Sequence, residues 1–105
     1  MKERKDSIGS AMLRDCEIGI RGANGELNPD LAWKMASMIE FSRQPNIPLK
    51  IRLRTEEYMD RLGISDDLAS KLIEIRQDVV SNYTLGSNLK QAGVGRMSLF
   101  LMETY

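Results

Sequence analysis

Basic side chains alternate with apolar ones across residues 49–54, and further basic residues follow in the next two predicted helices. If this segment is extended, its apolar side chains lie on one face and its basic side chains on the other. Basic side chains grouped in this way can neutralise nucleic-acid phosphates. A solvated strand edge has the same pattern, because charges there discourage unwanted strand pairing. The candidates for DNA contact are Lys50, Arg52, Arg54, Arg61, Lys71 and Arg76.

The remaining residues do not indicate catalysis or metal binding. The chain has no histidine, and its single cysteine, Cys16, has no base at a recognisable spacing, so nucleophilic catalysis lacks its usual groups. Zinc sites need clusters of cysteine or histidine, and the composition contains none. Gly93 and Gly95 lack the third glycine, the lysine and the preceding strand of a phosphate-binding loop, so we expect a turn there. The prediction is a protein that is not an enzyme and has no metal or cofactor.

Two pairs of acids, Glu56–Glu57 and Asp66–Asp67, have the residue type of general acids and bases. Each pair follows a residue that can cap a helix, Thr55 and Ser65. The helix dipole favours negative charge at such N-terminal positions. We therefore interpret both pairs as residues in the first turns of helices.

Length and composition indicate one folded domain over residues 1–105. Hydrophobic residues make up 42% of the chain. No apolar stretch approaches the roughly 20 residues of a membrane span. Residues 1–6 are charged and predict a flexible polar tail, with no apolar signal sequence behind them. We expect a cytoplasmic protein without membrane association, in which Cys16 has no internal disulfide partner.

The charges of the chain balance. There are 15 basic and 15 acidic residues, which give a net charge of +0. Proteins that bind DNA alone usually carry a basic excess. We therefore expect a local basic surface here, or a partner protein that supplies part of the DNA affinity.

Two helices are expected in the first half of the chain. Residues 7–20 have apolar side chains at steps of four and predict a short helix, which ends in a glycine-containing loop at 21–25. Asn28, followed by a proline and an acid, is a typical helix N-cap, and helical spacing continues to about Gln44. Two prolines then end this second helix.

The second half is expected to hold a strand, two helices and a glycine-rich end. Residues 49–54 predict the strand. A helix follows and ends at Gly63, and Ser65 starts another that runs to about Asn82. The glycine-rich remainder predicts loops, followed by a short strand at 96–102. The expected fold class is therefore mostly α: a small helical domain with a helix-turn-helix-like unit and one or two short strands.

The clearest pattern covers residues 57–72, a short helix, a turn at Gly63 and a second helix. This is the layout of a helix-turn-helix, which often places its second helix against DNA. The match is partial, because Met59 is large where a small residue usually lets the helices approach, and Ala69 is small where a branched residue is usual. A ribbon-helix-helix repressor is an alternative, in which the strand at 49–54 enters the major groove.

The helix that begins at Ser65 carries two apolar stripes. A stripe this wide indicates a helix packed on two sides, as at the centre of a small domain or in a dimer. We expect a dimer whose contacts come from the helices around 31–39 and 68–80. The predicted dimer and partner residues are Leu31, Met35, Met38, Ile39, Leu68, Leu72, Ile75 and Val79.

One part of the chain resembles a known family. Residues 59–75 begin Met-Asp-Arg-Leu-Gly-Ile-Ser and carry Ala69 and Leu72 further on; they resemble the central segment of FlhD, a transcriptional activator subunit. The helix around 31–38 is similar in character to the long first helix of that family. Residues 96–102 look like its C-terminal apolar segment.

The resemblance implies a mostly helical homodimer that assembles with an FlhC-like subunit, binds promoters and recruits RNA polymerase. In that family the partner supplies zinc and much of the DNA affinity, which agrees with the balanced charge. The chain departs from the family around 45–54 and over 1–25, as a divergent member from a conjugative element would. We expect a DNA-binding transcriptional activator subunit. The alternative from another class is a small helical interaction adaptor that touches no nucleic acid.

Overall fold

The computed structural model describes residues 4–22, 26–82 and 88–104, and these ranges consist of helices and short connections. Neither of the two predicted strands is present in them. None of the helices in these ranges is both long and apolar enough to cross a membrane. In chain order the helices are α1 (Arg4–Gly22), α2 (Pro29–Ser42), α3 (Leu49–Leu62), α4 (Asp66–Ser81) and α5 (Leu89–Thr104).

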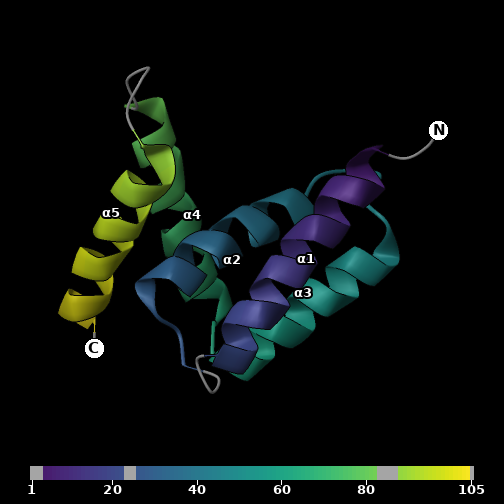
Figure 1. The fold of residues 1–105 in the computed structure, drawn as a ribbon, viewed down its shortest axis with the longest axis horizontal. Coiled ribbons are helices and arrows are strands. Elements are labelled where there is room, and N and C mark those ends of the chain that lie inside the picture. Colours follow the sequence, from purple (N-terminus) through teal and green to yellow (C-terminus); the bar gives the residue numbers. More distant parts are fainter. Residues whose placement is uncertain (1–3, 23–25, 83–87, 105) are drawn as a thin grey trace.

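Helix α2 lies at the centre of the domain and packs against each of the other helices (Figure 1). It is therefore buried on most sides, and Leu31, Met35 and Met38 are each at most 1% exposed. Helix α1 also packs on α3, and α4 also packs on α5. Within the described residues, no helix of the α1–α3 pair packs on a helix of the α4–α5 pair. The two pairs are thus held together by their shared contact with α2.

The start of α2 confirms the predicted cap. The backbone amide of Leu31 donates a hydrogen bond to Asn28 Oδ1 at 2.8 Å, and Pro29 takes the first helical position. Such a cap satisfies one of the amides that have no partner at a helix N-terminus. The helix ends at Ser42, slightly before the predicted end at Gln44.

The predicted strand at 49–54 is wrong, because this segment forms the beginning of α3. Its alternation also fits a helix, since Leu49 and Leu53 are one turn apart and Ile51 lies on the opposite side. Ile51 is fully buried, whereas Leu49 and Leu53 are 66% and 56% exposed. Pro48 stands directly before the helix as its N-cap residue. A paired ribbon at this segment, and with it the ribbon-helix-helix fold, is therefore excluded.

The buried face of α3 continues at helical spacing from Ile51 to Thr55, Tyr58 and Leu62. Thr55 lies within the helix and does not cap it, and its hydroxyl donates a hydrogen bond to the Ile51 carbonyl at 2.7 Å. The acid pair at 56–57 consequently lies in the middle of α3, so its predicted place at a helix N-terminus is wrong.

Gly63 ends α3 as predicted, with φ 68° and ψ 32° in the left-handed region. The Ile64 amide donates to the Met59 carbonyl at 2.8 Å, which is a common way to close a helix at a glycine. Ser65 then caps α4, because its Oγ accepts a hydrogen bond from the Leu68 amide at 3.1 Å. The acid pair at 66–67 stands in the first turn of α4, which confirms that prediction.

The two helices on either side of Gly63 do not pack against each other over the described residues. Each packs on α2 instead, and α4 ends at Ser81, close to the predicted Asn82. The chain therefore has the helix–turn–helix connection that the sequence predicts. It lacks the mutual packing by which that motif holds its second helix at a fixed angle to the first.

The loops and strand predicted at the C-terminal end are wrong over the described residues, where 89–104 form α5. Gly93 and Gly95 lie inside this helix. Gly93 is buried against the indole of Trp33, and the absence of a Cβ lets α5 approach α2 closely there. Gly86, expected in the loop, lies outside the described residues.

Helix α1 begins before the predicted Ser7 and ends after the predicted Ile20. Residues 4–6, expected in a flexible tail, are helical, and residues 1–3 lie outside the described part. Of the loop predicted at 21–25, the first two residues belong to α1 and the other three lie outside the described part.

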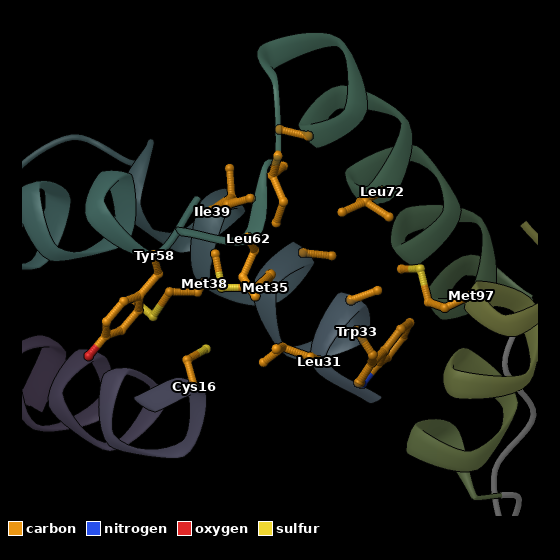
Figure 2. Packing of buried hydrophobic residues seen from close by; sticks show 14 of the residues in the cluster. Cys16, Leu31, Trp33, Met35, Met38, Ile39, Tyr58, Leu62, Leu72 and Met97 are labelled. Atoms are coloured by element: carbon orange, nitrogen blue, oxygen red, sulfur yellow. The ribbon is translucent and has the colours of Figure 1, made fainter. Parts of the chain in front are cut away.

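Figure 2 shows the core on the two sides of α2. Cys16 of α1 and Tyr58 of α3 lie on one side, and Leu72 of α4 and Met97 of α5 on the other; each is at most 2% exposed. Met35 and Met38 of α2 and Met97 of α5 are fully buried in this core, and their flexible thioether side chains can fill irregular gaps between helices.

Candidate nucleic-acid interface

Helices α1 and α3 lie side by side (Figure 1). A groove of about 280 Å³ runs between their side chains. Two of the predicted DNA-binding residues, Lys50 and Arg54, line this groove because they are one helical turn apart on α3. Arg14 of α1 joins them from the facing helix. The groove residues are Ser10, Leu13, Arg14, Glu17, Lys50, Arg54 and Tyr58.

Two of the three groove cations are not neutralised by other described residues. Arg14 and Lys50 are exposed, and neither has an acidic partner in the described part of the chain. Arg54 Nε lies 3.6 Å from Glu57 Oε1. The other Glu57 oxygen lies 3.0 Å from Arg61 Nη2, so one carboxylate serves two guanidinium groups. With Glu17 also at the groove, the local excess of positive charge is modest.

Tyr58 lies at the base of the groove. The residue is 2% exposed, and its hydroxyl points toward α1 in Figure 2. Burial raises the pKa of this phenol, Glu17 raises it further, and Arg54 acts in the opposite direction. The hydroxyl therefore stays protonated at neutral pH and is able to donate a hydrogen bond.

Arg52 does not join Lys50 and Arg54. Successive helical residues are rotated by about 100°, so a residue two positions away lies far around the helix. Arg52 Nη2 donates to the Gln44 carbonyl at 3.1 Å and lines a different cleft, between α3 and α4. The single basic face expected for residues 49–54 is therefore divided between two sides of α3.

Arg76 is held inside the chain, between α4 and α2. Its Nε donates to Ser37 Oγ at 2.7 Å, and its Nη1 donates to Glu40 Oε1 at 2.7 Å. The guanidinium carbon lies 5.6 Å from the centroid of the Trp33 ring, within the range of a cation–π contact. These contacts occupy two of the guanidinium nitrogens, Nε and Nη1, which a phosphate would otherwise bind.

The last two predicted DNA-binding residues do not line the groove. Arg61 is exposed on α3, and its ion pair with Glu57 is of the surface type. Lys71 is exposed on α4, and no other described residue pairs with it. Four of the six predicted cations, Arg52, Arg61, Lys71 and Arg76, thus lie outside the groove that Lys50 and Arg54 line.

The predicted dimer and partner residues lie mainly in the core of one chain. Leu31, Met35, Met38, Ile39 and Leu72 are each at most 1% exposed, and Val79 is 7% exposed. Leu68 and Ile75 are half-buried and pack against that core. The wide stripe on α4 is explained by its packing against both α2 and α5. The burial of these residues is explained within one chain and needs no dimer. A dimer contact through α2 and α4 stays a prediction.

Arg14 is the groove residue that sequence reasoning misses. The helical pattern over residues 7–20 is carried by apolar side chains alone, which point to the core. Arg14 stands two positions from Met12 and Cys16, so it lies to the side of that stripe. Only the packing of α1 on α3 brings it to Lys50.

Cys16 carries the one thiol of the sequence, and the structure buries it. Desolvation, with a contribution from Asp15, raises the pKa of the thiol to about 12. A buried neutral thiol is a poor nucleophile. No cluster of three or more metal-ligating side chains is found among the described residues. That the chain is not an enzyme and takes no cofactor remains a prediction.

Comparisons with protein-family models, with curated proteins and with solved structures gave no match to this chain. The resemblance to FlhD therefore rests on residues 59–75 and the helices around them, and it stays a prediction.

Proposed function

We propose that the chain is a subunit of a DNA-binding transcription-activating complex and contacts the DNA backbone through the groove between α1 and α3. The observation that carries the proposal is the meeting of Arg14, Lys50 and Arg54 at one groove, with the first two not neutralised by other described residues. Cations placed on two adjacent helices can contact successive phosphates, and each contact adds salt-dependent affinity.

The rest of the affinity comes from a partner in this proposal. The net charge of +0, and the internal contacts of Arg76, leave few cations for DNA. If α4 entered a groove of the DNA, the two acids in its first turn would face phosphates and be repelled by them. We therefore do not assign α4 the role of a recognition helix. An FlhC-like subunit, a homodimer and contact with RNA polymerase are the partners that the family resemblance implies, and they belong to this proposal.

A helical interaction adaptor without DNA contact is the second candidate. It is favoured by a cleft between α3 and α4 whose charged residues form no ion pair with other described residues. The two candidates differ in whether nucleic acid is bound at all, so a DNA-binding measurement separates them.

A gel-shift titration over a salt series tests the leading candidate, with the chain alone and with the protein encoded next to it. The change is Arg14→Ala, Lys50→Ala and Arg54→Ala together. We expect weaker binding and a salt slope that falls by roughly one unit for each phosphate that the variant no longer neutralises. Circular dichroism should show an unchanged helical content, because these side chains lie at the surface.

The matched control removes three positive charges elsewhere, with Arg43→Ala, Lys71→Ala and Arg96→Ala, of which, as in the groove, two are unpaired among the described residues and one has an exposed ion pair. If this control weakens binding as much as the groove variant, the effect is one of total charge and the groove is not the contact. Absence of DNA binding by the chain in every combination would favour the adaptor.

A further inference from the structure

The cleft between α3 and α4 gathers charged side chains that the described part of the chain does not neutralise. It has a volume of about 620 Å³ and runs along α3 beside the end of α2 to the α3–α4 connection, where Asp66 is the residue of α4 that lines it. Several other charged groups on these helices are paired, as Arg61 is with Glu57 and Asp78 is with Arg96 at 2.9 Å. The charged residues that line the cleft are Arg43, Arg52, Glu56, Asp60 and Asp66.

None of these five side chains has an ion pair among the described residues. Arg52 reaches only a backbone carbonyl, although Glu56 stands one turn away on the same helix. All five residues are exposed, so no surrounding atoms of the described residues keep these charged groups from an ionic partner. The charges at the cleft are therefore available to another molecule.

The charges are also ordered along the cleft. Arg52, Glu56 and Asp60 follow one another at steps of one turn along α3, about 6 Å apart. Arg43 lies at the basic end, after α2, and Asp66 lies across from Asp60, at the start of α4. The cleft is thus positive toward the start of α3 and negative toward its end.

This order is opposite to the order that favours α3 itself. The helix dipole is positive at the N-terminus, where acids stabilise a helix and bases do not. Here Arg52 lies near the start of α3 and Asp60 near its end. Arg43 and Asp66 do have local reasons for their charge, since they stand at a helix C-terminus and a helix N-terminus. Arg52 forms one hydrogen bond, to the Gln44 carbonyl, and the described part of the fold offers no such local reason for the charges of Glu56 and Asp60.

Apolar side chains complete the surface. Met59, half-buried, lines the cleft together with the buried Ile39 and Ile64. Leu49 and Leu53 lie beside Arg52 and Glu56 on α3 and are the large apolar residues that this helix leaves most exposed. A ligand along this side of α3 would cover both leucines as well as the charges.

We propose that this cleft docks an amphipathic helix of a partner protein, with acidic residues in its first turn and basic residues in its last turn, lying parallel to α3. That charge order is the one that stabilises an isolated helix, so it places acids against Arg43 and Arg52 and bases against Asp60 and Asp66. Apolar side chains of the partner at i and i+4 pack on Met59 and Ile64, which line the cleft. The cleft and the α1–α3 groove lie on different sides of α3, so this interaction does not depend on DNA binding.

The test uses a fluorescent synthetic helix of about 16 residues, a length at which a designed helix is populated in water. It has glutamates in the first turn, two central leucines at i and i+4, and lysines in the last turn. The control peptide has the same composition with the two charged ends exchanged. Fluorescence anisotropy measures binding of both peptides to the full chain. We expect the first peptide to bind roughly 10-fold more tightly than the second, and less so at high salt.

A charge-swapped protein, Arg52→Glu with Asp60→Lys, should prefer the exchanged peptide. Lys71→Glu with Glu74→Lys is the matched control, because these residues lie on α4 and do not line the cleft; its preference should equal that of the natural chain. Equal affinity for the two peptides, no binding, or an unchanged preference after the swap overturns the proposal. Self-association of the natural chain that the swap abolishes also overturns it, because the occupant would then be a second copy.

Discussion

The indole of Trp33 in α2 packs directly on the backbone of Gly93 in α5. A Cβ at position 93 would overlap three ring carbons, so only glycine lets the two helices approach as they do. The ring therefore rests on the helix backbone itself, without a side chain of residue 93 between them. The pair fixes the depth at which α5 sits on the core.

Gly93→Ala should therefore destabilise the fold. Alanine favours a helix over glycine by roughly 1 kcal/mol, but overpacking against the ring costs about 1–3 kcal/mol, and the ring cannot bend away as a flexible chain would. We expect a net loss in the free energy of unfolding, measured by urea denaturation. Gly95→Ala is the control in the same helix, where a Cβ meets open space. It should gain roughly 0.5–1 kcal/mol, and a loss at both positions would contradict the packing argument.

Arg76 should contribute to stability through its link between α4 and α2. Arg76→Ala removes two hydrogen bonds and the contact with Trp33, and it leaves Glu40 with only Gln77, at 3.1 Å. Both ionic side chains are about two-thirds buried or more, so we expect a loss of roughly 2 kcal/mol in urea denaturation. Arg76→Lys should lose roughly half of that, since an ammonium group cannot form the same fork.

Arg61→Ala is the matched control for Arg76, because its ion pair with Glu57 is exposed. It should change the free energy of unfolding by about 0.5 kcal/mol or less. The same Arg76→Ala variant should leave the salt slope of DNA binding unchanged. A lower slope would show that this guanidinium leaves Glu40 to meet phosphate.

Gly63→Ala should destabilise the chain through its backbone alone. The residue has φ 68°, and no atom lies within 4 Å of the place where a Cβ would be, so a clash with other residues cannot contribute. The left-handed conformation costs a residue with a Cβ roughly 1–2 kcal/mol. Gly63→Asn should cost distinctly less, because asparagine tolerates this region. Equal losses in thermal unfolding for the two variants would argue against the left-handed turn.

The Cys16 thiol should be protected from modification in the folded chain. With a pKa of about 12 and almost complete burial, it holds a negligible thiolate fraction at pH 8. We expect reaction with a disulfide reagent only at the rate of unfolding, and rapid reaction in denaturing urea. Fast labelling under native conditions would contradict the packing of α1.

The same pKa sets a direction for stability at high pH. The unfolded thiol ionises near pH 8.5 and the folded one near 12, so the unfolded state loses its proton first and the free energy of unfolding falls between these values. Below that range this contribution to stability is fully present. Cys16→Ala should show a shallower decline, even though it starts from a lower stability because of the cavity. The pKa of Tyr58 is raised chiefly by burial, so Tyr58 adds a decline of the same sign in both proteins; Cys16 also raises it, so removal of the thiol makes the decline of the variant shallower still. Parallel slopes would contradict the assignment.

The helix boundaries that the sequence predicts well depend on local chemistry. Asn28, Gly63 and Ser65 act on backbone groups within a few residues, so their types alone indicate where α2 and α4 begin and where α3 ends. Residues 49–54 show the limit of such reasoning. Over only six residues, the period of two of a strand and the period of 3.6 of a helix can bury the same side chains. Only the longer spacing of buried residues from Ile51 to Leu62 distinguishes the helix from the strand.

The candidate site depends on contacts that no local pattern contains. An arginine can be paired with an acid that is far away in the sequence. Arg76, for example, is paired with Glu40. By residue type alone Gly93 predicts a turn, but it lies within α5 and packs on Trp33, a residue far away in the sequence. The role of Arg14 could not be predicted for the same reason, because its neighbour in the groove, Lys50, lies on another helix.

The central place of α2 has a consequence for how the domain opens. Because α1, α3, α4 and α5 all pack on this helix in the described structure, neither the α1–α3 pair nor the α4–α5 pair can detach without exposing one side of α2 to water. Local opening of either half is therefore coupled to loss of the shared core, and the amides of α2 should be the last to exchange with deuterated solvent. Two ligands bound on opposite halves can therefore influence each other through the side chains of this helix, since both halves share it as a packing surface.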